Sequence, residues 1–329
     1  MSHALLIGGT RFIGRYTVAE FLDHGYEVTL FTRGNNPNPF AEDSRVSHVE
    51  GDRSNDSALE AVAADLSPDV VVDTVTYKPR AVESATRIFE NVDAYVSVSS
   101  GSAYEAEEIP KREDETPIHD CTEEEAVDDT WETYGPRKAE GDRAVFRAAE
   151  RGVNAMSIRP PIVYGPHDYT DRLRYWLSRV QHHDRVVVPG DGTNIWHRVF
   201  VGDVASAIRV IAESGTPGES YNVGDRNIPT MAGMVELIAE AFDTEIEMVT
   251  ASERELSVAD LALDDFPLYR DPPHVLSTAK LSALGWEATP LEESMAETVE
   301  AFRENEPDEI DAGPDRSAEE RVLQVLDTI

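Results

Sequence analysis

The sequence has little cysteine, little lysine and little positive charge. Its single cysteine, Cys121, excludes an internal disulfide, and only four of its 329 residues are lysines. Basic residues number 29 against 64 acidic ones, which gives a formal net charge of −35. This charge repels phosphate backbones, so neither nucleic acid nor an anionic membrane is expected as a partner. Such an acidic balance is typical of a halophile's surface.

Long hydrophobic runs are also missing. No stretch approaches the roughly 18 consecutive apolar residues that a membrane-spanning helix requires. No positively charged leader with an apolar core precedes the first strand-like run. Together with the single cysteine, these absences predict a soluble protein of the reducing cytoplasm.

Strand-like and helix-like runs alternate along the first half of the chain. This alternation predicts an α/β fold in which helices cover both faces of a doubly wound parallel sheet of seven strands. The expected strands are 4–7, 26–31, 46–49, 70–72, 94–99, 154–158 and 220–223, and the expected helices between them are 16–22, 58–66, 81–89, 136–150 and 204–212.

The pattern divides the chain into two domains. Residues 1–164, with 198–224 returning to them, form the expected nucleotide-binding domain, and residues 165–197 and 225–304 form a smaller, mixed substrate domain. Residues 305–329 are expected as an acidic tail, in which 317–326 form a short terminal helix. Asp203 is the predicted cap of the helix after it, and Thr289 followed by Pro290 predicts a capped helix start.

The first fourteen residues carry the most informative motif. A strand-like run, Ala4–Ile7, meets Gly8, Gly9, Thr10, Arg11, Phe12, Ile13 and Gly14, and a helix-like run follows. A helix N-terminus presents unpaired N–H groups, and glycines let a pyrophosphate approach the main chain. The motif therefore predicts a dinucleotide site, although strand-to-helix turns also use glycine for purely steric reasons.

The end of the second strand favours NADP over NAD as cofactor. A dinucleotide site usually places an acid there for the ribose hydroxyls, but this strand ends in Thr32, Arg33 and Gly34. Arg33, helped by Arg11, suits a ribose 2′-phosphate; the alternative is an arginine kept for solubility. Asp52 is placed to accept from the adenine amino group. Two further candidate cofactor residues are Arg53 and Thr74.

Tyr134 and Lys138 are the candidate catalytic pair. Residues four apart share one helix face, and a lysine ammonium there stabilises a neighbouring phenolate. This arrangement makes tyrosine a usable acid–base group. The pair opens a helix after the fifth strand, where the carboxyl ends of the sheet face the cofactor.

With these motifs the chain resembles members of the extended short-chain dehydrogenase/reductase superfamily, in its branch of NAD(P)-dependent epimerases and dehydratases. The resemblance covers nearly the whole chain and implies a Rossmann-like domain. It further implies that Ser100 holds the substrate hydroxyl, that Tyr134 is the acid–base and that Lys138 binds the nicotinamide ribose. The motifs that carry it are the glycine turn, 97–104, Tyr134 with Lys138, 159–166, 199–205, 221–224 and 284–286.

Departures from the family pattern narrow this expectation. Arg11 replaces the usual middle glycine, so the Gly-Gly-x-x-x-x-Gly turn resembles an atypical subgroup with members labelled epimerases, reductases and messenger-RNA-binding proteins. Gly101 and Ser102 stand where dehydratases carry an Asp-Glu pair, which disfavours dehydration. Trp196 replaces the arginine that grips the nucleotide diphosphate, with Arg198 close behind. Ser102, Trp196 and Arg198 remain candidate substrate residues, and Trp196 either stacks on a base or fills a domain interface.

The sequence therefore predicts an NADP-preferring sugar-nucleotide epimerase or reductase. The alternative is a non-catalytic NADP-binding sensor or RNA-associated protein on the same fold. The resemblance also implies a homodimer. His182 and His183 lack further ligands at metal spacing, so no metal site is predicted. The acidic segment 105–130 is either a lid over the site or a surface loop.

Overall fold

The computed structural model describes residues 2–328 and divides into two compact units. The first unit comprises residues 2–163, Val199–Gly224 and Leu276–Ala288. The second comprises Tyr164–Arg198, Asp225–Val275 and residues 289–328. The chain changes unit within two short strands, β7 (Ile162–Tyr164) and β9 (Arg198–Phe200).

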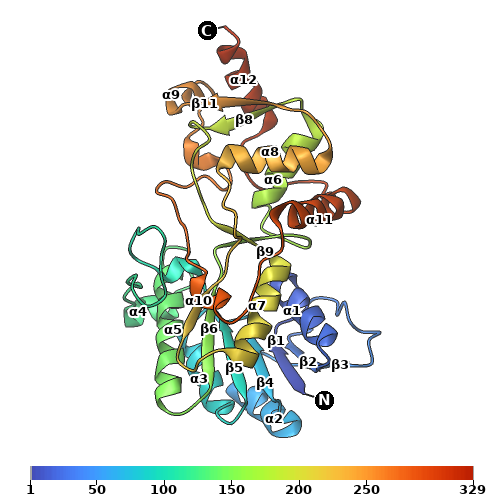
Figure 1. Ribbon diagram of the computed structural model, residues 1–329, viewed down its shortest axis with the longest axis vertical. Helices are drawn as coiled ribbons and strands as arrows, with labels where there is room; N and C mark the ends of the chain where they lie inside the picture. Colours follow the sequence, from blue (N-terminus) through green and yellow to red (C-terminus); the bar gives the residue numbers. More distant parts are fainter. Residues whose placement is uncertain (1, 329) are drawn as a thin grey trace. The chain divides into compact units, whose positions relative to one another are not determined.

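A seven-stranded sheet in which all strands are parallel forms the centre of the first unit (Figure 1). The strand order is β10-β6-β5-β4-β1-β2-β3, so the order reverses between β1 and β4. This is the predicted doubly wound fold, and it places the carboxyl ends of all strands at one edge. The strands are β1 (His3–Ile7), β2 (Glu27–Thr32), β3 (Val46–Glu50), β4 (Val70–Asp73), β5 (Ala94–Val98), β6 (Ala155–Arg159) and β10 (Ser220–Asn222).

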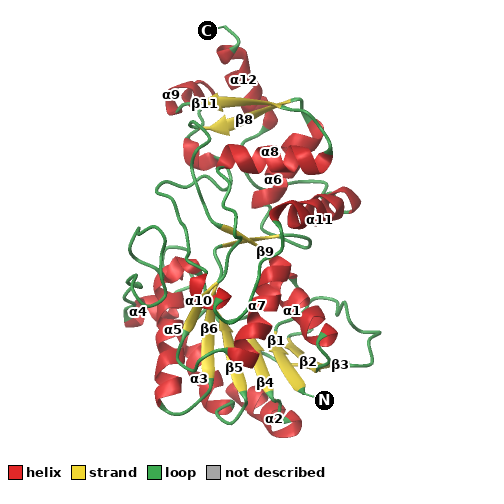
Figure 2. Ribbon diagram, in the orientation of Figure 1, coloured by secondary structure: helices red, strands yellow, loops and turns green. Residues whose placement is uncertain are grey.

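Helices cover both faces of this sheet (Figure 2). Two pack together on one face, α1 (Phe12–Asp23) and α7 (Val201–Ser214). Three lie on the other, α2 (Asp56–Leu66), α3 (Pro79–Ile88) and α5 (Tyr134–Glu150). The shorter helices of the unit are η1 (Gly101–Ala103), α4 (Glu123–Val127) and α10 (Ala279–Ser282).

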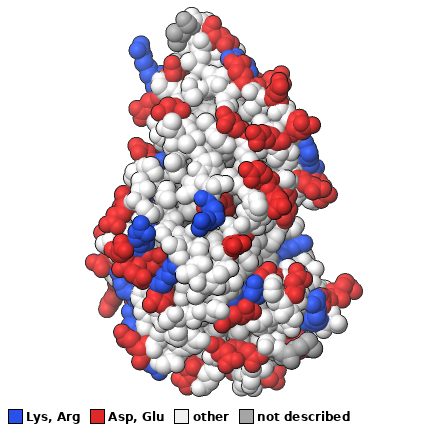
Figure 3. Space-filling view, in the orientation of Figure 1, with Lys and Arg blue, Asp and Glu red and all other residues white. Residues whose placement is uncertain are grey.

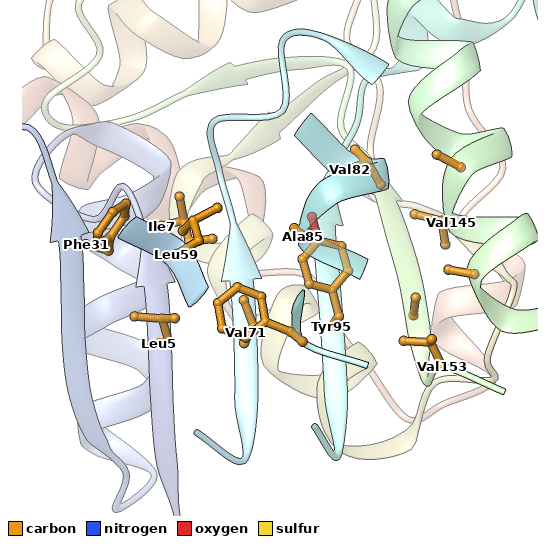
Figure 4. Close-up of a cluster of buried hydrophobic side chains, with 14 of the residues drawn as sticks. Leu5, Ile7, Phe31, Leu59, Val71, Val82, Ala85, Tyr95, Val145 and Val153 are labelled. Atoms are coloured by element: carbon orange, nitrogen blue, oxygen red, sulfur yellow. The ribbon is translucent and has the colours of Figure 1, made fainter. Parts of the chain in front are cut away.

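The core explains why the central strands, such as β1 and β4, are almost continuously apolar. Leu5 and Val71 point to the face that carries α2, α3 and α5, and they belong to the same buried cluster as Leu59 of α2 and Val82 of α3 (Figure 4). Leu6, the neighbour of Leu5, is equally buried. A strand with both faces covered needs apolar residues at every position, which is the run that the sequence shows.

The second unit is built from helices around a two-stranded parallel sheet, β8 (Arg185–Pro189) and β11 (Glu247–Ala251). α8 (Met231–Phe242) packs against α6 (Arg172–His182) and against α11 (Leu291–Glu304). The remaining elements are α9 (Glu253–Leu256), η2 (Ser257–Ala259), η3 (Leu263–Asp265) and α12 (Arg316–Leu326).

The structure differs from the predicted division of the chain in two segments. Residues 276–288, assigned to the second domain, lie in the first unit. The predicted tail 305–329 contains α12, which belongs to the second unit and buries Glu319, Val322 and Leu323. Glu319 accepts hydrogen bonds from Tyr175 at 2.8 Å and from Arg179 at 2.5 Å. These buried contacts fix a segment whose acidic composition suggested a tail.

Two predicted helix starts are also shifted. α7 begins at Val201, so Asp203 lies in its first turn and is not its cap. α11 begins at Leu291 with Pro290 in the cap position, one residue later than the pattern of Thr289 and Pro290 indicated.

No helix within residues 2–328 is long and apolar enough to cross a membrane. Over the same residues, no group of three or more His, Cys, Asp or Glu side chains could hold a metal ion. His182, at the end of α6, contacts Glu306 at 2.6 Å.

A buried histidine makes the stability of the second unit depend on pH. His197 is 1% exposed, and its Nε2 lies 2.9 Å from the Asp225 carbonyl oxygen, to which a neutral ring donates. Burial, with a smaller contribution from the Arg198 charge, lowers its pKa to about 4. An unfolded histidine has a pKa near 6.5, so the folded state favours the neutral ring, and this stabilisation is lost as pH falls below that value.

We therefore expect the free energy of unfolding to fall by about 2 kcal/mol between about pH 7.5 and pH 5 through this group alone. Urea unfolding followed by circular dichroism, in molar KCl, measures the change. The variant His197→Gln should have a flatter pH profile over the same range. Parallel profiles for the two proteins would show that His197 does not cause the dependence.

Candidate active site

The glycine turn between β1 and α1 leaves no room for side chains. Gly8 and Gly9 have φ angles of +107° and +100°, which favour glycine. A Cβ on Gly8 would lie 2.1 Å from the Thr74 hydroxyl oxygen, and a Cβ on Gly14 would lie 2.6 Å from the Gly9 nitrogen. The start of α1 thus rests directly on the turn, at the point where the strand order reverses. This is a close fit to the geometry that holds a dinucleotide pyrophosphate.

The other residues of the turn divide into exposed and buried ones. Arg11 occupies the cap position of α1 with extended backbone and an exposed side chain. Phe12 is only 6% exposed, so its ring packs inside the unit and its main chain faces the turn. Thr10 and Ile13 are half-buried. The first turn of α1 contains no acidic residue, which leaves its positive end available to an anion.

Arg33 and Asp52 follow β2 and β3 at the same sheet edge, and both are exposed. Hydrogen bonds from Ser54 lower the pKa of the Asp52 carboxyl, and the charge of Arg33 adds to that effect. The Asp52 carboxylate accepts from the Ser54 nitrogen at 2.8 Å, so one of its oxygens is held within its own loop. These two side chains lie close enough to influence each other electrostatically.

Arg53 and Thr74 make contacts within the fold. The Arg53 guanidinium donates to the fully buried Asp73 carboxylate at 2.6 Å and also to the Ala81 carbonyl oxygen. Burial acts to lower the pKa of Arg53, but the Asp73 charge outweighs it and the pKa is raised. The Thr74 hydroxyl donates to the Ile7 carbonyl oxygen at 3.0 Å. Both residues therefore support the sheet edge beside the turn.

Tyr134 and Lys138 lie on the same side of α5, as their spacing predicts. Lys138 Nζ lies 5.6 Å from the centre of the Tyr134 ring. The ammonium is buried and donates to the Val98 carbonyl oxygen at 2.9 Å and to the Thr76 hydroxyl at 3.4 Å. Thr76 lies just after β4 and Val98 is the last residue of β5, so the lysine is fixed at the carboxyl edge of the sheet.

Ser100 follows β5 at this edge. Its side-chain oxygen accepts from the Ser102 nitrogen at 3.1 Å and caps η1. Gly135 lets the start of α5 approach this turn, since a Cβ there would lie 2.6 Å from the Ser102 carbonyl oxygen. The absence of a side chain at Gly135 thus brings Tyr134, its neighbour, toward the Ser100 turn.

Trp196 and Arg198 belong to the second unit. The Arg270 guanidinium carbon lies 5.4 Å from the Trp196 ring, in a cation–π contact. Arg198 is buried and donates to the Pro229 carbonyl oxygen at 3.1 Å. Burial lowers its pKa against the opposing charge of Asp225. Within their unit, both candidate substrate residues contact groups of the chain itself.

A sequence profile of the NAD dependent epimerase/dehydratase family matches residues 4–224, which span the turn, Ser100, Tyr134 and Lys138. The chain belongs to this family. Its members are NAD-dependent enzymes of the extended short-chain dehydrogenase/reductase type, as the residues of the turn and of α5 led us to expect.

The proteins to which this chain is similar in sequence are named for different roles. The chain is 28% identical over 296 residues to a chloroplast stem-loop binding protein of 41 kDa from Arabidopsis thaliana, covering 86% of this chain and 74% of that protein. It is 30% identical over 149 residues to dTDP-D-glucose 4,6-dehydratase from Bos taurus, covering 44% of this chain and 39% of the enzyme. The chain thus matches well under half of that dehydratase.

Solved structures share the fold. The dTDP-glucose 4,6-dehydratase of Bacillus anthracis in complex with NAD superposes with a TM-score of 0.73 at 22% identity, over 93% of this chain and 98% of that one. The UDP-glucose 4-epimerase of Thermotoga maritima gives a TM-score of 0.67 at 21% identity, over 92% and 99% of the two chains.

Four residues beside the Tyr134–Lys138 pair were not predicted to belong to the site. They are Thr76, Tyr77, Trp131 and Arg137, which surround the Tyr134–Lys138 pair. Arg137 could have been found from the sequence, because it lies between the two motif residues of the same predicted helix. The other three come from loops, whose positions the sequence pattern does not reveal.

Proposed function

We propose that the protein is an NADP-preferring epimerase or reductase of sugar nucleotides. The observation that carries the proposal is the convergence of Ser100, Tyr134 and Lys138 at the sheet edge that also holds the glycine turn. The named activities of the dehydratase and epimerase relatives support a nucleotide sugar as substrate. The homodimer that the family resemblance implies belongs to the same proposal.

Each residue of the chain has a distinct role in this proposal. The Tyr134 phenol exchanges a proton with a substrate hydroxyl, and the Lys138 ammonium stabilises the phenolate form. Ser100 holds the same hydroxyl. The turn, with the N-terminus of α1, holds the pyrophosphate, and the nicotinamide supplies hydride chemistry at the adjacent carbon. Gly101 and Ser102 provide no carboxylic acid, so the proposal does not include dehydration of the dTDP-glucose type.

The preference for NADP rests on Arg33, an exposed guanidinium after β2 where an acid would favour NAD. Replacing Arg33 by Ser should weaken NADPH binding by about 10-fold or more and leave NADH binding within about a factor of two, since a charge-assisted hydrogen bond contributes roughly 1.5–3 kcal/mol. Calorimetry with both cofactors in molar KCl measures this. Equal losses for the two cofactors would assign Arg33 a general role and remove the argument for NADP.

The proposed reaction is tested by identifying the cofactor and then the conversion. Native mass spectrometry of freshly purified protein should show retained NADP, or NAD. NMR of UDP- and dTDP-sugars incubated with the protein should then show an epimer, or a reduced sugar when NADPH is supplied. Binding of neither cofactor, or no conversion across the sugar panel by cofactor-loaded protein, would contradict the proposal.

One observation favours RNA binding as a second candidate function, namely the name of the Arabidopsis relative. The charge of this chain argues against it. Acidic side chains are spread over the face shown in Figure 3, where basic ones are fewer and scattered. A protein with a net charge of −35 repels a phosphate backbone. Filter binding of a stem-loop RNA across a salt series separates the two functions, because RNA binding would weaken steeply with salt.

A further inference from the structure

Two aromatic side chains flank the Tyr134–Lys138 pair. The Trp131 ring stacks on the Tyr134 ring with centroids 4.8 Å apart and an angle of 10° between the planes. The Tyr77 ring lies 5.3 Å from Lys138 Nζ. Trp131 is 74% exposed and Tyr77 is 50% exposed, so hydrophobic burial does not explain their positions. We call these two side chains the aromatic wall.

A single buried arginine ties both parts of the wall to α5. Arg137 is 4% exposed, and its guanidinium donates to three points. Nη1 donates to the Tyr77 carbonyl oxygen at 2.9 Å, and Nη2 donates to the Thr130 carbonyl oxygen at 2.7 Å. Nε lies 3.2 Å from the Thr133 hydroxyl oxygen. A planar fork with fixed donor directions can hold three segments in one geometry, whereas an ammonium on a flexible stem cannot.

The loop that carries Trp131 has further supports of the same kind. The Asp128 carboxylate accepts from the Thr133 hydroxyl at 2.9 Å and also from the Thr130 hydroxyl. Lys78, next to Tyr77 in the chain, donates to the Val127 carbonyl oxygen at 2.9 Å. The exposed indole therefore stands on a loop whose main chain is fixed at both sides of it.

We propose that Arg137 is a positioning residue that holds Trp131 against Tyr134 and Tyr77 against Lys138, and that Trp131 fixes the orientation of the phenol by covering one face of its ring. The proposal rests on the proposed role of Tyr134 as the acid–base. Arg137 itself touches no reacting atom, because its donors are directed to the chain. Its effect on turnover runs through the position of the phenol.

The contact between Trp131 and Tyr134 can be followed by tryptophan fluorescence without any substrate. Ionised tyrosine quenches a tryptophan in contact with it, so the emission of Trp131 should fall as Tyr134 loses its proton. The difference between wild type and Trp131→Phe isolates this emission from the other three tryptophans. The pH-dependent step should be present in wild type and absent in Tyr134→Phe. A step that persists unchanged in Tyr134→Phe would overturn the contact role of Trp131.

Two variants then test Arg137. Arg137→Lys keeps a charge but loses the fork, and Thr133→Val keeps the arginine but removes one of its acceptors together with the bond from Thr133 to Asp128. For each folded variant we expect acrylamide to quench Trp131 more strongly and the emission step to shift in pH or disappear. Circular dichroism checks folding, so a collapse of one variant leaves the other informative. The matched control is Arg147→Lys, an arginine on the same helix whose ion pairs with Glu83 and Glu140 are exposed.

Turnover supplies the second reading. With a substrate that wild type converts, Arg137→Lys should lower kcat by about 10- to 100-fold and change KM less, because a misplaced phenol affects the transition state more than binding. Wild-type quenching and an unshifted emission step in both variants would overturn the proposal. A failure of the proposed function leaves the fluorescence readings intact, because none of them depends on conversion.

Discussion

Replacing Tyr134 by Phe should lower kcat/KM by about 10²- to 10⁴-fold on any nucleotide sugar that wild type converts, since that is the usual contribution of a positioned acid–base group. The substitution removes one oxygen and keeps the ring that stacks on Trp131. Lys138 keeps its bonds to Val98 and Thr76, so the sheet edge is preserved. The loss should therefore appear in the chemical step, with NADPH binding retained.

Steady-state kinetics with calorimetry of NADPH binding, both in molar KCl, make this measurement. Tyr26→Phe is the matched control. Tyr26 lies just after the C-terminal end of α1, and its hydroxyl donates an exposed 3.3 Å bond to Glu213 of α7. Rate constants for Tyr134→Phe equal to those of wild type would reject the acid–base role. A loss of NADPH binding of the same size would instead assign Tyr134 to cofactor binding.

Asp142→Ala should destabilise the first unit by about 3–5 kcal/mol, because it leaves a buried guanidinium without its counter-charge. Asp142, on α5, accepts from Arg159 Nε at 2.7 Å, and both side chains are 1% exposed. Burial acts to lower the pKa of Arg159, but the Asp142 carboxylate outweighs it and the pKa is raised. The Arg159 guanidinium also lies over the Tyr104 ring, with its carbon 4.7 Å from the ring centre.

Urea unfolding in molar KCl gives this free energy. Glu140→Ala, two residues away on the same helix, removes partly exposed pairs with Arg143 and Arg147 and should cost less than about 1 kcal/mol. Similar losses for the two variants would mean that the Arg159–Asp142 pair contributes little beyond surface charge. A folded Asp142→Ala variant with wild-type stability would likewise show that the Arg159–Asp142 pair contributes little to the free energy of unfolding.

The parts of the fold that were predictable from sequence are those with strong local periodicity. Val70–Val72 is apolar throughout and Ala94–Val98 is apolar except at Ser97, because helices cover both sheet faces, and the sequence shows that directly. The glycine at Gly25 ends α1 with a φ of +82°, as predicted from its place after the helical run. Such signals depend on neighbours in the chain, so they survive without tertiary information.

The unpredicted parts depend on contacts between distant residues. The helix α12 was expected from the sequence, but its packing was not, because Glu319 receives bonds from Tyr175 and Arg179, more than a hundred residues earlier. Arg137 was visible in the motif, but its partners Tyr77 and Thr130 lie in loops of no regular pattern. Periodicity gives the elements and the spacing of Tyr134 and Lys138; it gives neither the loops that surround them nor a buried ion pair.

The position of β10 has a consequence for biosynthesis. β10 pairs only with β6 at the sheet edge, and its residues, Ser220–Asn222, come after about two thirds of the chain. Segment 276–288 joins the same unit later still. The nascent protein therefore leaves the ribosome with the β6 edge uncovered for as long as the intervening residues take to be translated. A free strand edge is a template for pairing with other chains, so the β6 edge is open to such pairing during that interval.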